Sequence, residues 1–300
     1  PKICKDYQEI QFLKHYSSHF IHKGFLVKNQ KSQKIQTPKL TKSSQQSNPK
    51  IPINAQKAYK LLSLQENISN NEAKNLIDRG LVSINGKKLR IARALLAPQT
   101  KFKIQTPNKI IEIFRDSQIL ALEKPAFLTS EEIASSYPEW VLLHRLDKET
   151  SGILLLVKNQ SAFHIKAKES FKQMQVKKHY IAIVEGIIEE ECEITAPLLI
   201  KKGKFARVTI GKKGEGHKAI TRIRPLEISG KKTKIAVEIQ TGKTHQIRVH
   251  LAHLKHPIVG DTFYGAKPAN RILLHAESIA LLDYNFTCPP PKEFIFMDNV

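Results

Sequence analysis

Residues 144–152 (HRLDKETSG) gather side chains that could carry out chemistry, next to a strand-like apolar run at 153–157. Asp147 has a cation two residues before it and hydroxyl groups three and four residues after it. A rigid strand beside a polar turn is a common way to fix and expose a reactive group. An ionised carboxylate there could act as a nucleophile or a base. The alternative is a turn aspartate that only caps the next element.

Arg145 is the first expected partner of Asp147. Side chains at positions i and i+2 face the same side of a strand, so a strand here would place the guanidinium beside the carboxylate. We therefore expect Arg145 to keep Asp147 ionised at neutral pH.

A second polar segment, TGKTHQIRVH at 241–250, is expected where a strand ends at Gly242 and a helix begins near Thr244. Cations and amides gather there, and the backbone N–H groups of a helix N-terminus already favour an anion.

A third segment has Tyr180 at the start of a strand. A tyrosine at that place usually packs in the core, but near a basic groove it could stack on a base.

Metal binding is the rival interpretation of the second segment, because His250, His253 and His256 repeat every third residue. No carboxylate or thiol joins them at ligand spacing, and Pro257 would end the helix, so we expect no metal. The sequence also lacks the GxGxxG and Walker patterns, so we expect no nucleotide cofactor.

The composition favours nucleic acid as the partner. The chain has 49 Lys and Arg against 27 Asp and Glu, a formal net charge of +22. Nucleic acid and anionic membranes are the usual partners of such a charge. No apolar run approaches the roughly 18 residues of a spanning helix, and no signal peptide is recognisable. The three cysteines fit neither a disulfide framework nor a zinc site. We therefore expect a cytoplasmic protein that binds no membrane.

Three regions are expected along the chain. Residues 1–52 predict a basic, partly flexible extension, because their apolar density is too low to offset the entropy of ordering. Residues 53–106 predict two small helices and a β-hairpin, with Ser69 as a helix cap and Asn85-Gly86 as the hairpin turn. Residues 108–300 predict one α+β domain with a mainly antiparallel sheet, because helices do not regularly separate its strands. The expected strands are 119–122, 153–157, 180–184, 219–224, 235–239, 272–275 and 294–297.

Residues 53–106 resemble a small RNA-binding module of ribosomal proteins, the alpha-L motif. The resemblance rests on residues 68–88, which include the helix cap, the hairpin turn and the lysines after it. It implies RNA binding. A basic hairpin with a purely structural role is the alternative.

Residues 108–300 resemble the RluA-type family of RNA pseudouridine synthases. The resemblance rests on segments that occur in the family's order: EKPA at 123–126, HRLDKETSG at 144–152, KHY at 178–180, TGKTHQIRVH at 241–250, PIVGD at 257–261 and LLHA at 273–276. It implies a mixed, mainly antiparallel sheet flanked by helices, with no cofactor and no metal. It also implies the isomerisation of specific uridines to pseudouridine in structured RNA, after the base has been flipped out.

The resemblance also implies roles for individual residues. Asp147 would be the essential catalytic carboxylate, and Arg248 would pair with it. Arg145 would fill the space left by the flipped base, and Tyr180 would pack on the uracil. Other residues of the same segments are expected to contact the substrate: Thr150, Lys243, His245 and Gln246.

Two departures from the family pattern stand out. Residues 127–130 (FLTS) replace the glycine and the small apolar run that usually follow the EKPA segment. Lys243 stands where arginine is commoner, which keeps the charge but loses the planar fork.

We expect large-subunit ribosomal RNA as the substrate, because the small module accompanies mostly ribosomal substrates in this family. Transfer RNA is the alternative substrate, and a non-catalytic RNA-binding or ribosome-assembly protein is the alternative function. We expect a monomer.

Overall fold

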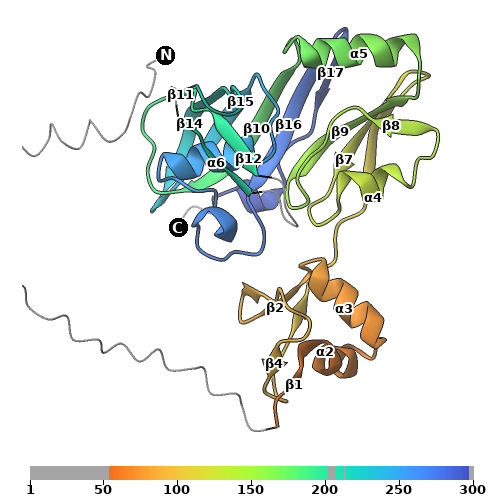
Figure 1. Cartoon of the computed structure of the whole chain (residues 1–300), viewed down its shortest axis with the longest axis vertical. Coiled ribbons are helices and arrows are strands. Elements are labelled where there is room, and N and C mark those ends of the chain that lie inside the picture. The colour runs from red at the N-terminus through yellow and green to blue at the C-terminus, as the bar shows by residue number, and fades with distance from the viewer. Residues whose placement is uncertain (1–53, 202–206, 213, 297–300) are drawn as a thin grey trace, which may run out of the picture.

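The computed structural model describes residues 54–201, 207–212 and 214–296, so the extension predicted at 1–52 lies outside the described residues. The described chain forms a small N-terminal unit and a larger unit that contains a long twisted sheet (Figure 1). In the described part of the chain, no helix is both long enough and apolar enough to cross a membrane.

The small unit packs two helices on short strands. A three-stranded sheet has the order β3-β2-β5, and β1 pairs with β4. The core between helices and strands contains Leu62, Ala73, Ile77 and Val82. The elements are β1 (Gln56–Lys57), α2 (Ala58–Glu66), α3 (Asn70–Asp78), β2 (Val82–Ile84), β3 (Lys87–Lys88), β4 (Leu95–Leu96) and β5 (Lys103–Ile104).

Local sequence signals set the ends of these elements. The Ser69 side chain accepts a hydrogen bond of 3.1 Å from the backbone N–H of Glu72, as predicted for the cap of α3. Asn85 and Gly86 have φ angles of 48° and 74°, which a type I′ turn requires. The structure has a hairpin turn between β2 and β3 at these residues.

The larger unit contains a ten-stranded sheet with the order β11-β14-β15-β10-β16-β9-β7-β6, with β17 beside β16 and β8 beside β9. Every strand pair in it is antiparallel except β16 with β9, so the predicted mixed, mainly antiparallel sheet is confirmed. The strands are β6 (Ile111–Arg115), β7 (Ile119–Lys124), β8 (Trp140–Leu142), β9 (Ser151–Lys158), β10 (Lys177–Glu185), β11 (Cys192–Ile194), β14 (Thr221–Ser229), β15 (Lys232–Ile239), β16 (Leu274–Leu281) and β17 (Tyr284–Thr287).

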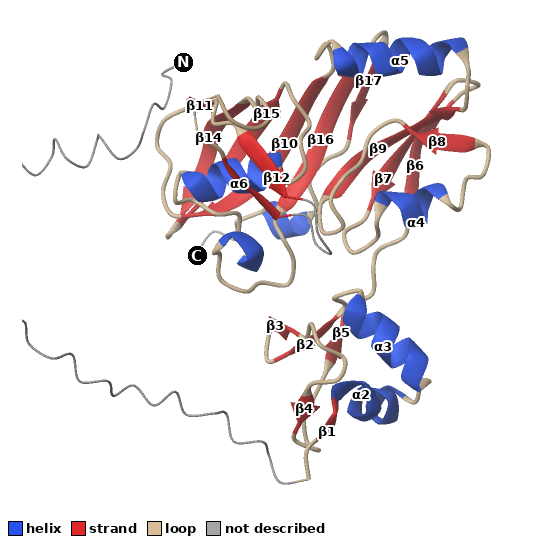
Figure 2. Ribbon diagram, in the orientation of Figure 1, coloured by secondary structure: helices blue, strands red, loops and turns tan. Residues whose placement is uncertain are grey.

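Few helices accompany this sheet (Figure 2). They are α4 (Ser130–Ala134), α5 (Ala162–Lys172) and α6 (Gln246–His253), with the short 3-10 helices η1 (Thr262–Tyr264) and η2 (Lys292–Phe294). A separate hairpin, β12 (Leu198–Lys201) with β13 (Arg207–Ile210), lies next to α6.

The strand predicted at 294–297 is wrong for its described residues. Phe294 ends η2, where its N–H bonds to the carbonyl of Pro291 at 2.9 Å. Its ring is fully buried and lies under the guanidinium of Arg271, at 5.3 Å. Pro291 precedes η2, and the turn of this short helix takes the place of the start of the predicted strand.

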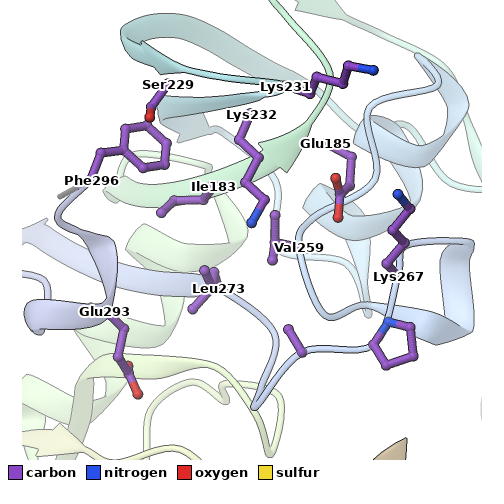
Figure 3. Close-up of a pocket in the computed structure, with 12 residues that line it drawn as sticks. Ile183, Glu185, Ser229, Lys231, Lys232, Val259, Lys267, Leu273, Glu293 and Phe296 are labelled. Atoms are coloured by element: carbon purple, nitrogen blue, oxygen red, sulfur yellow. The ribbon is translucent and has the colours of Figure 1, made fainter. Parts of the chain in front are cut away.

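Strand β10 has apolar side chains on both of its faces, and each face belongs to a different apolar cluster. Tyr180, Ala182 and Val184 belong to the core under α6, whereas Ile181 and Ile183 face the other way. The other side holds a pocket of about 590 Å³ (Figure 3). Its lining is Ile183, Glu185, Ser229, Lys231, Lys232, Val259, Lys267, Pro268, Ala269, Leu273, Glu293 and Phe296. This pocket is therefore not on the face that carries Tyr180.

Gly152 allows the parallel pairing of β9 with β16. Its φ is +112°, and a Cβ atom there would lie 2.2 Å from the carbonyl oxygen of Ala276. Gly152→Ala is expected to lower the free energy of unfolding by at least about 3 kcal/mol, because backbone strain and a backbone clash add together. Urea unfolding measures this loss.

Gly230→Ala is the matched control for that prediction. Gly230 also has a positive φ, +56°, but nothing lies within 4 Å of the added Cβ. The cost there should be the strain alone, about 1 kcal/mol. Equal losses for the two variants would show that the contact with Ala276 is unimportant.

Candidate active site

Asp147 lies in the loop between β8 and β9, and a buried lysine holds this loop. Lys124, at the end of β7, donates hydrogen bonds to the carbonyls of Pro125 (3.0 Å), Lys148 (3.1 Å) and Thr150 (2.7 Å). Burial lowers the pKa of Lys124 to about 7, while the charge of Asp147 acts in the opposite direction. Three carbonyl acceptors match the three donors of an ammonium group, and they support its charged form.

The segment that departs from the family pattern, 127–130, also supports this loop. The N–H of Phe127 donates to the carbonyl of Lys148 at 2.8 Å. The Ser130 hydroxyl accepts from the N–H of Leu146 at 3.0 Å and donates to its carbonyl at 3.2 Å. Both residues on either side of Asp147 are therefore fixed through their backbones.

Arg248, in the first turn of α6, bridges two carboxylates. Its Nη1 donates to Oδ2 of Asp147 at 2.8 Å. Its Nε and Nη2 donate to the two oxygens of Asp261 at 2.7 and 3.0 Å, which is a bidentate pair. Asp261 is almost completely buried, whereas the Asp147 side chain is 28% exposed. The buried Asp261 thus anchors Arg248, and Arg248 in turn holds the accessible carboxylate of Asp147.

The charge of Arg248 is stabilised by its neighbours. Burial alone would lower the pKa of Arg248, but the hydrogen bond to Asp261 and the charges of Asp147 and Asp261 outweigh burial and raise it. The guanidinium also lies 5.1 Å from the ring centre of Tyr264. These contacts hold one permanent positive charge against Asp147.

His245 approaches the same oxygen of Asp147 as Arg248 does. It precedes α6 with a left-handed backbone, φ 53°, and its Nε2 lies 3.7 Å from Oδ2 of Asp147. Its Nδ1 is 2.8 Å from the Tyr264 hydroxyl. Burial lowers the pKa of His245, and the charge of Asp147 counteracts this in part.

Tyr180, on β10, contributes a neutral aromatic ring. Burial raises the pKa of the Tyr180 hydroxyl, and the negative charge of Asp147 raises it further. Tyr180 shares its apolar cluster with Leu146, the residue before Asp147. The structure therefore brings Asp147, Tyr180, His245 and Arg248 together.

Arg145 is not a partner of Asp147, which corrects the expectation drawn from the i, i+2 spacing. Residues 145–147 do not form a strand, and the Nε of Arg145 lies 2.7 Å from Oε1 of Glu131. The Arg145 side chain is 74% exposed. Arg248 takes the place predicted for Arg145, since the loop backbone, held by Ser130, turns Arg145 away from the carboxylate.

Two residues that are expected to contact the substrate have partners within the protein. The Gln246 side chain accepts from Thr241 (2.7 Å) and the Lys243 N–H (3.1 Å), and donates to Ile220 (2.9 Å) and Thr221 (3.1 Å). It therefore fixes the segment before α6. Thr150 is buried, and its carbonyl accepts from Lys124. The Lys243 side chain is exposed near the same segment, so its contact with substrate stays a prediction.

Two of the three repeated histidines have protein partners. His250 Nε2 lies 2.9 Å from the carbonyl of Ala196, and its Nδ1 is 2.9 Å from the Thr221 hydroxyl. His256 Nδ1 lies 2.9 Å from the carbonyl of Glu185. Among the residues that the structure describes, no three His, Cys, Asp or Glu side chains are grouped to hold a metal ion.

Buried histidines predict a loss of stability in acid. His250 and His275 are fully buried, and burial lowers the pKa of each to about 4. The unfolded chain binds their protons near pH 6.5 and the folded chain does not, so stability is lost as pH falls from about 6.5 towards 4. Each should contribute about 1.4 kcal/mol per pH unit within that window.

Urea unfolding at about pH 7 and about pH 5 tests this dependence. His250→Gln should make the difference between the two values smaller, by up to about 2 kcal/mol. His253→Gln is the control, because His253 lies on the same helix and is exposed. An unchanged difference for His250→Gln would contradict the assignment.

Sequence reasoning gave no role to Asp261, Tyr264 and Lys124. Asp261 anchors Arg248, Tyr264 contacts both Arg248 and His245, and Lys124 holds the Asp147 loop. The signal was present in part, because the PIVGD segment extends the family resemblance as far as Asp261.

The arrangement places an accessible carboxylate beside a permanently charged guanidinium and a neutral tyrosine. The Asp147 carboxylate is fixed by a guanidinium, and the neighbouring Tyr180 hydroxyl has a raised pKa. Such a site suits a single carboxylate that attacks a substrate or removes a proton from it.

Comparisons with known proteins identify the family of this chain. A family model described as RNA pseudouridylate synthase matches residues 117–253. A Helicobacter pylori (strain J99) protein, described as an uncharacterized RNA pseudouridine synthase, is 57% identical over 241 residues, which cover 80% of this chain and 99% of the relative. The ribosomal large subunit pseudouridine synthase C of Buchnera aphidicola is 31% identical over 265 residues, or 74% of this chain and 82% of the relative.

The solved structure of Human RNA Pseudouridylate Synthase Domain Containing 1 has a similar fold. Its TM-score is 0.53 at 24% identity, over 60% of this chain and 83% of that chain. The sequence matches extend far beyond the motif segments and confirm the resemblance: the chain belongs to the RluA-type RNA pseudouridine synthases, which isomerise uridine to pseudouridine in RNA.

Proposed function

We propose that this enzyme modifies specific uridines of large-subunit ribosomal RNA, and that Asp147 is its catalytic residue. The observation that carries the catalytic assignment is the Arg248 bridge. It holds Asp147 at 2.8 Å and Asp261 at 2.7 Å, yet leaves only Asp147 open to a substrate. A flipped uridine would meet this carboxylate first.

The neighbouring residues take supporting roles in this proposal. Tyr180 would pack on the uracil as a neutral ring, since its hydroxyl pKa is raised. Arg145 would enter the RNA at the position left by the flipped base, which agrees with its 74% exposure. His245 and Lys243 would contact the substrate at the start of α6. Each role follows the family resemblance.

The ribosomal substrate is supported by two observations. The Buchnera relative carries the name of a ribosomal large subunit pseudouridine synthase. The net charge of +22 suits a large polyanion. We further propose that the small unit at 53–106 binds RNA, that the enzyme works in the cytoplasm and that it is a monomer.

Mapping pseudouridines in total RNA tests the substrate. RNA is compared between a strain with the gene and a strain without it, and the missing pseudouridines should lie in large-subunit ribosomal RNA. A strain that carries Asp147→Ala should lack the same pseudouridines. Pseudouridines that disappear only from transfer RNA would overturn the ribosomal assignment and leave the enzymatic one intact.

A further inference from the structure

The hairpin of the small unit reaches the two chain segments that carry the active-site acids. Lys88, in β3, forms an ion pair with Glu149, which follows Asp147 by two residues. Arg90 donates from Nη2 to the hydroxyl of Thr262 at 2.8 Å, and Thr262 directly follows Asp261. The hairpin and the residues that follow it therefore contact both the loop of the exposed acid and the segment next to the anchor of Arg248.

Glu149 connects these contacts to the central sheet. Its Oε2, which binds Lys88, also accepts from the backbone N–H of Ile272 at 3.2 Å. Nη1 of Arg271 donates to the Glu149 carbonyl at 3.3 Å. Residues 271–272 lead directly into β16, which pairs with the start of β9. Glu149 is thus fixed on three sides.

Lys88 also contacts the other support of the Asp147 loop. Its ammonium group lies 5.4 Å from the ring centre of Phe127, whose N–H bonds to the carbonyl of Lys148. The side chains of Lys88 and Glu149 are only 14% and 24% exposed. A pair this far from solvent is screened less by salt than an ordinary surface pair, which contributes little.

We propose that Lys88 and Glu149 are positioning residues for the isomerisation, so that the small unit is part of the support of the active site as well as an RNA-binding unit. The Lys88 charge holds Glu149, and Glu149 holds the turn that follows Asp147. Loss of this pair lets the loop move relative to Arg248. The chemical step then slows although RNA still binds.

A double-mutant cycle tests the proposal. The full-length variants are Lys88→Met, Glu149→Gln and the double variant, and Gln keeps an acceptor for the Ile272 N–H. Total RNA from a strain that lacks the gene, labelled with tritium at uracil C5, is the probe, because C5 loses its hydrogen when it bonds to the ribose. Each single variant should release tritium about fivefold more slowly in single turnovers at saturating enzyme, and the double variant should be no slower than either.

Lys87→Met is the matched control, because Lys87 is the exposed neighbour of Lys88 in the same strand. It should change the enzyme concentration for half-maximal rate and leave the maximal rate unchanged. Lys88→Met should lower the maximal rate and leave the enzyme concentration for half-maximal rate unchanged. Lys88→Arg, which keeps the charge, should retain most of the wild-type rate. Urea unfolding of each variant shows that the enzyme stays folded in the assay.

Two results would overturn the proposal. If the effects of Lys88→Met and Glu149→Gln multiply in the double variant, the two residues act independently. If Lys88→Met behaves like Lys87→Met, Lys88 is only an RNA contact. Neither result depends on which RNA class is modified, because total RNA contains every class.

Discussion

Asp147→Asn is expected to lower the single-turnover rate of tritium release by about a thousandfold or more, with RNA affinity changed by less than about threefold. The amide keeps the size of the side chain and an oxygen that can accept from Arg248. It loses the negative charge, and with it the ability to attack the substrate or remove a proton. The rate therefore falls although the RNA surface is unchanged. Filter binding measures the affinity on the same labelled RNA.

Asp283→Asn is the matched control for this loss. Asp283 is exposed in the turn between β16 and β17, away from Arg248. Its replacement should leave both rate and affinity at the wild-type values. If Asp147→Asn retains more than about a tenth of the wild-type rate, another group must supply the chemistry.

Arg248→Met is expected to affect folding and catalysis together. Asp261 is almost completely buried, and without Arg248 its charge would have no cation against it. Breaking a buried pair in this way costs about 3–5 kcal/mol. The single-turnover rate should fall by roughly a hundredfold, because the same change releases Asp147. Urea unfolding and tritium release measure the two effects.

The double variant Arg248→Met/Asp261→Asn separates these effects. It removes the buried charge, so most of the lost stability should return, but the rate should stay low. If the rate returned with the stability, Arg248 would serve folding alone. Arg222→Met is the control for the loss of a surface arginine, because Arg222 pairs with Glu193 and Glu238 while 43% exposed. It should cost less than about 1 kcal/mol.

Much of the secondary structure could be predicted from local sequence patterns. The hairpin at Asn85-Gly86 and the cap at Ser69 depend on neighbouring residues only, and the structure contains both. Strands β9 and β15 follow from short apolar or alternating runs. The strand expected at 294–297 is wrong for its described residues, because Phe294 ends the short helix η2, which a short apolar alternation does not predict.

Contacts between distant segments could not be predicted in the same way. Asp147 was found because its own motif is informative, whereas its pairing with Arg248, 101 residues away in the chain, was expected only from the family resemblance. The i, i+2 rule selected Arg145, and it applies only where the backbone is a strand. The hydrogen bonds of Ser130 to Leu146 decide the loop conformation, and no spacing within the HRLDKETSG segment encodes them.

The position of β16 in the sheet has a consequence for the newly made enzyme. Strands β9 and β10 are consecutive in the chain, but β16 lies between them in the sheet, and His275 pairs with Ser151 across 124 residues. The Asp147 loop leads into β9, and Tyr180 belongs to β10. During translation, β9 and β10 cannot reach their final positions on either side of β16 until β16 has left the ribosome. A nascent chain that ends before β16 therefore contains Asp147, Tyr180 and Arg248 but lacks the strand that sets their final arrangement.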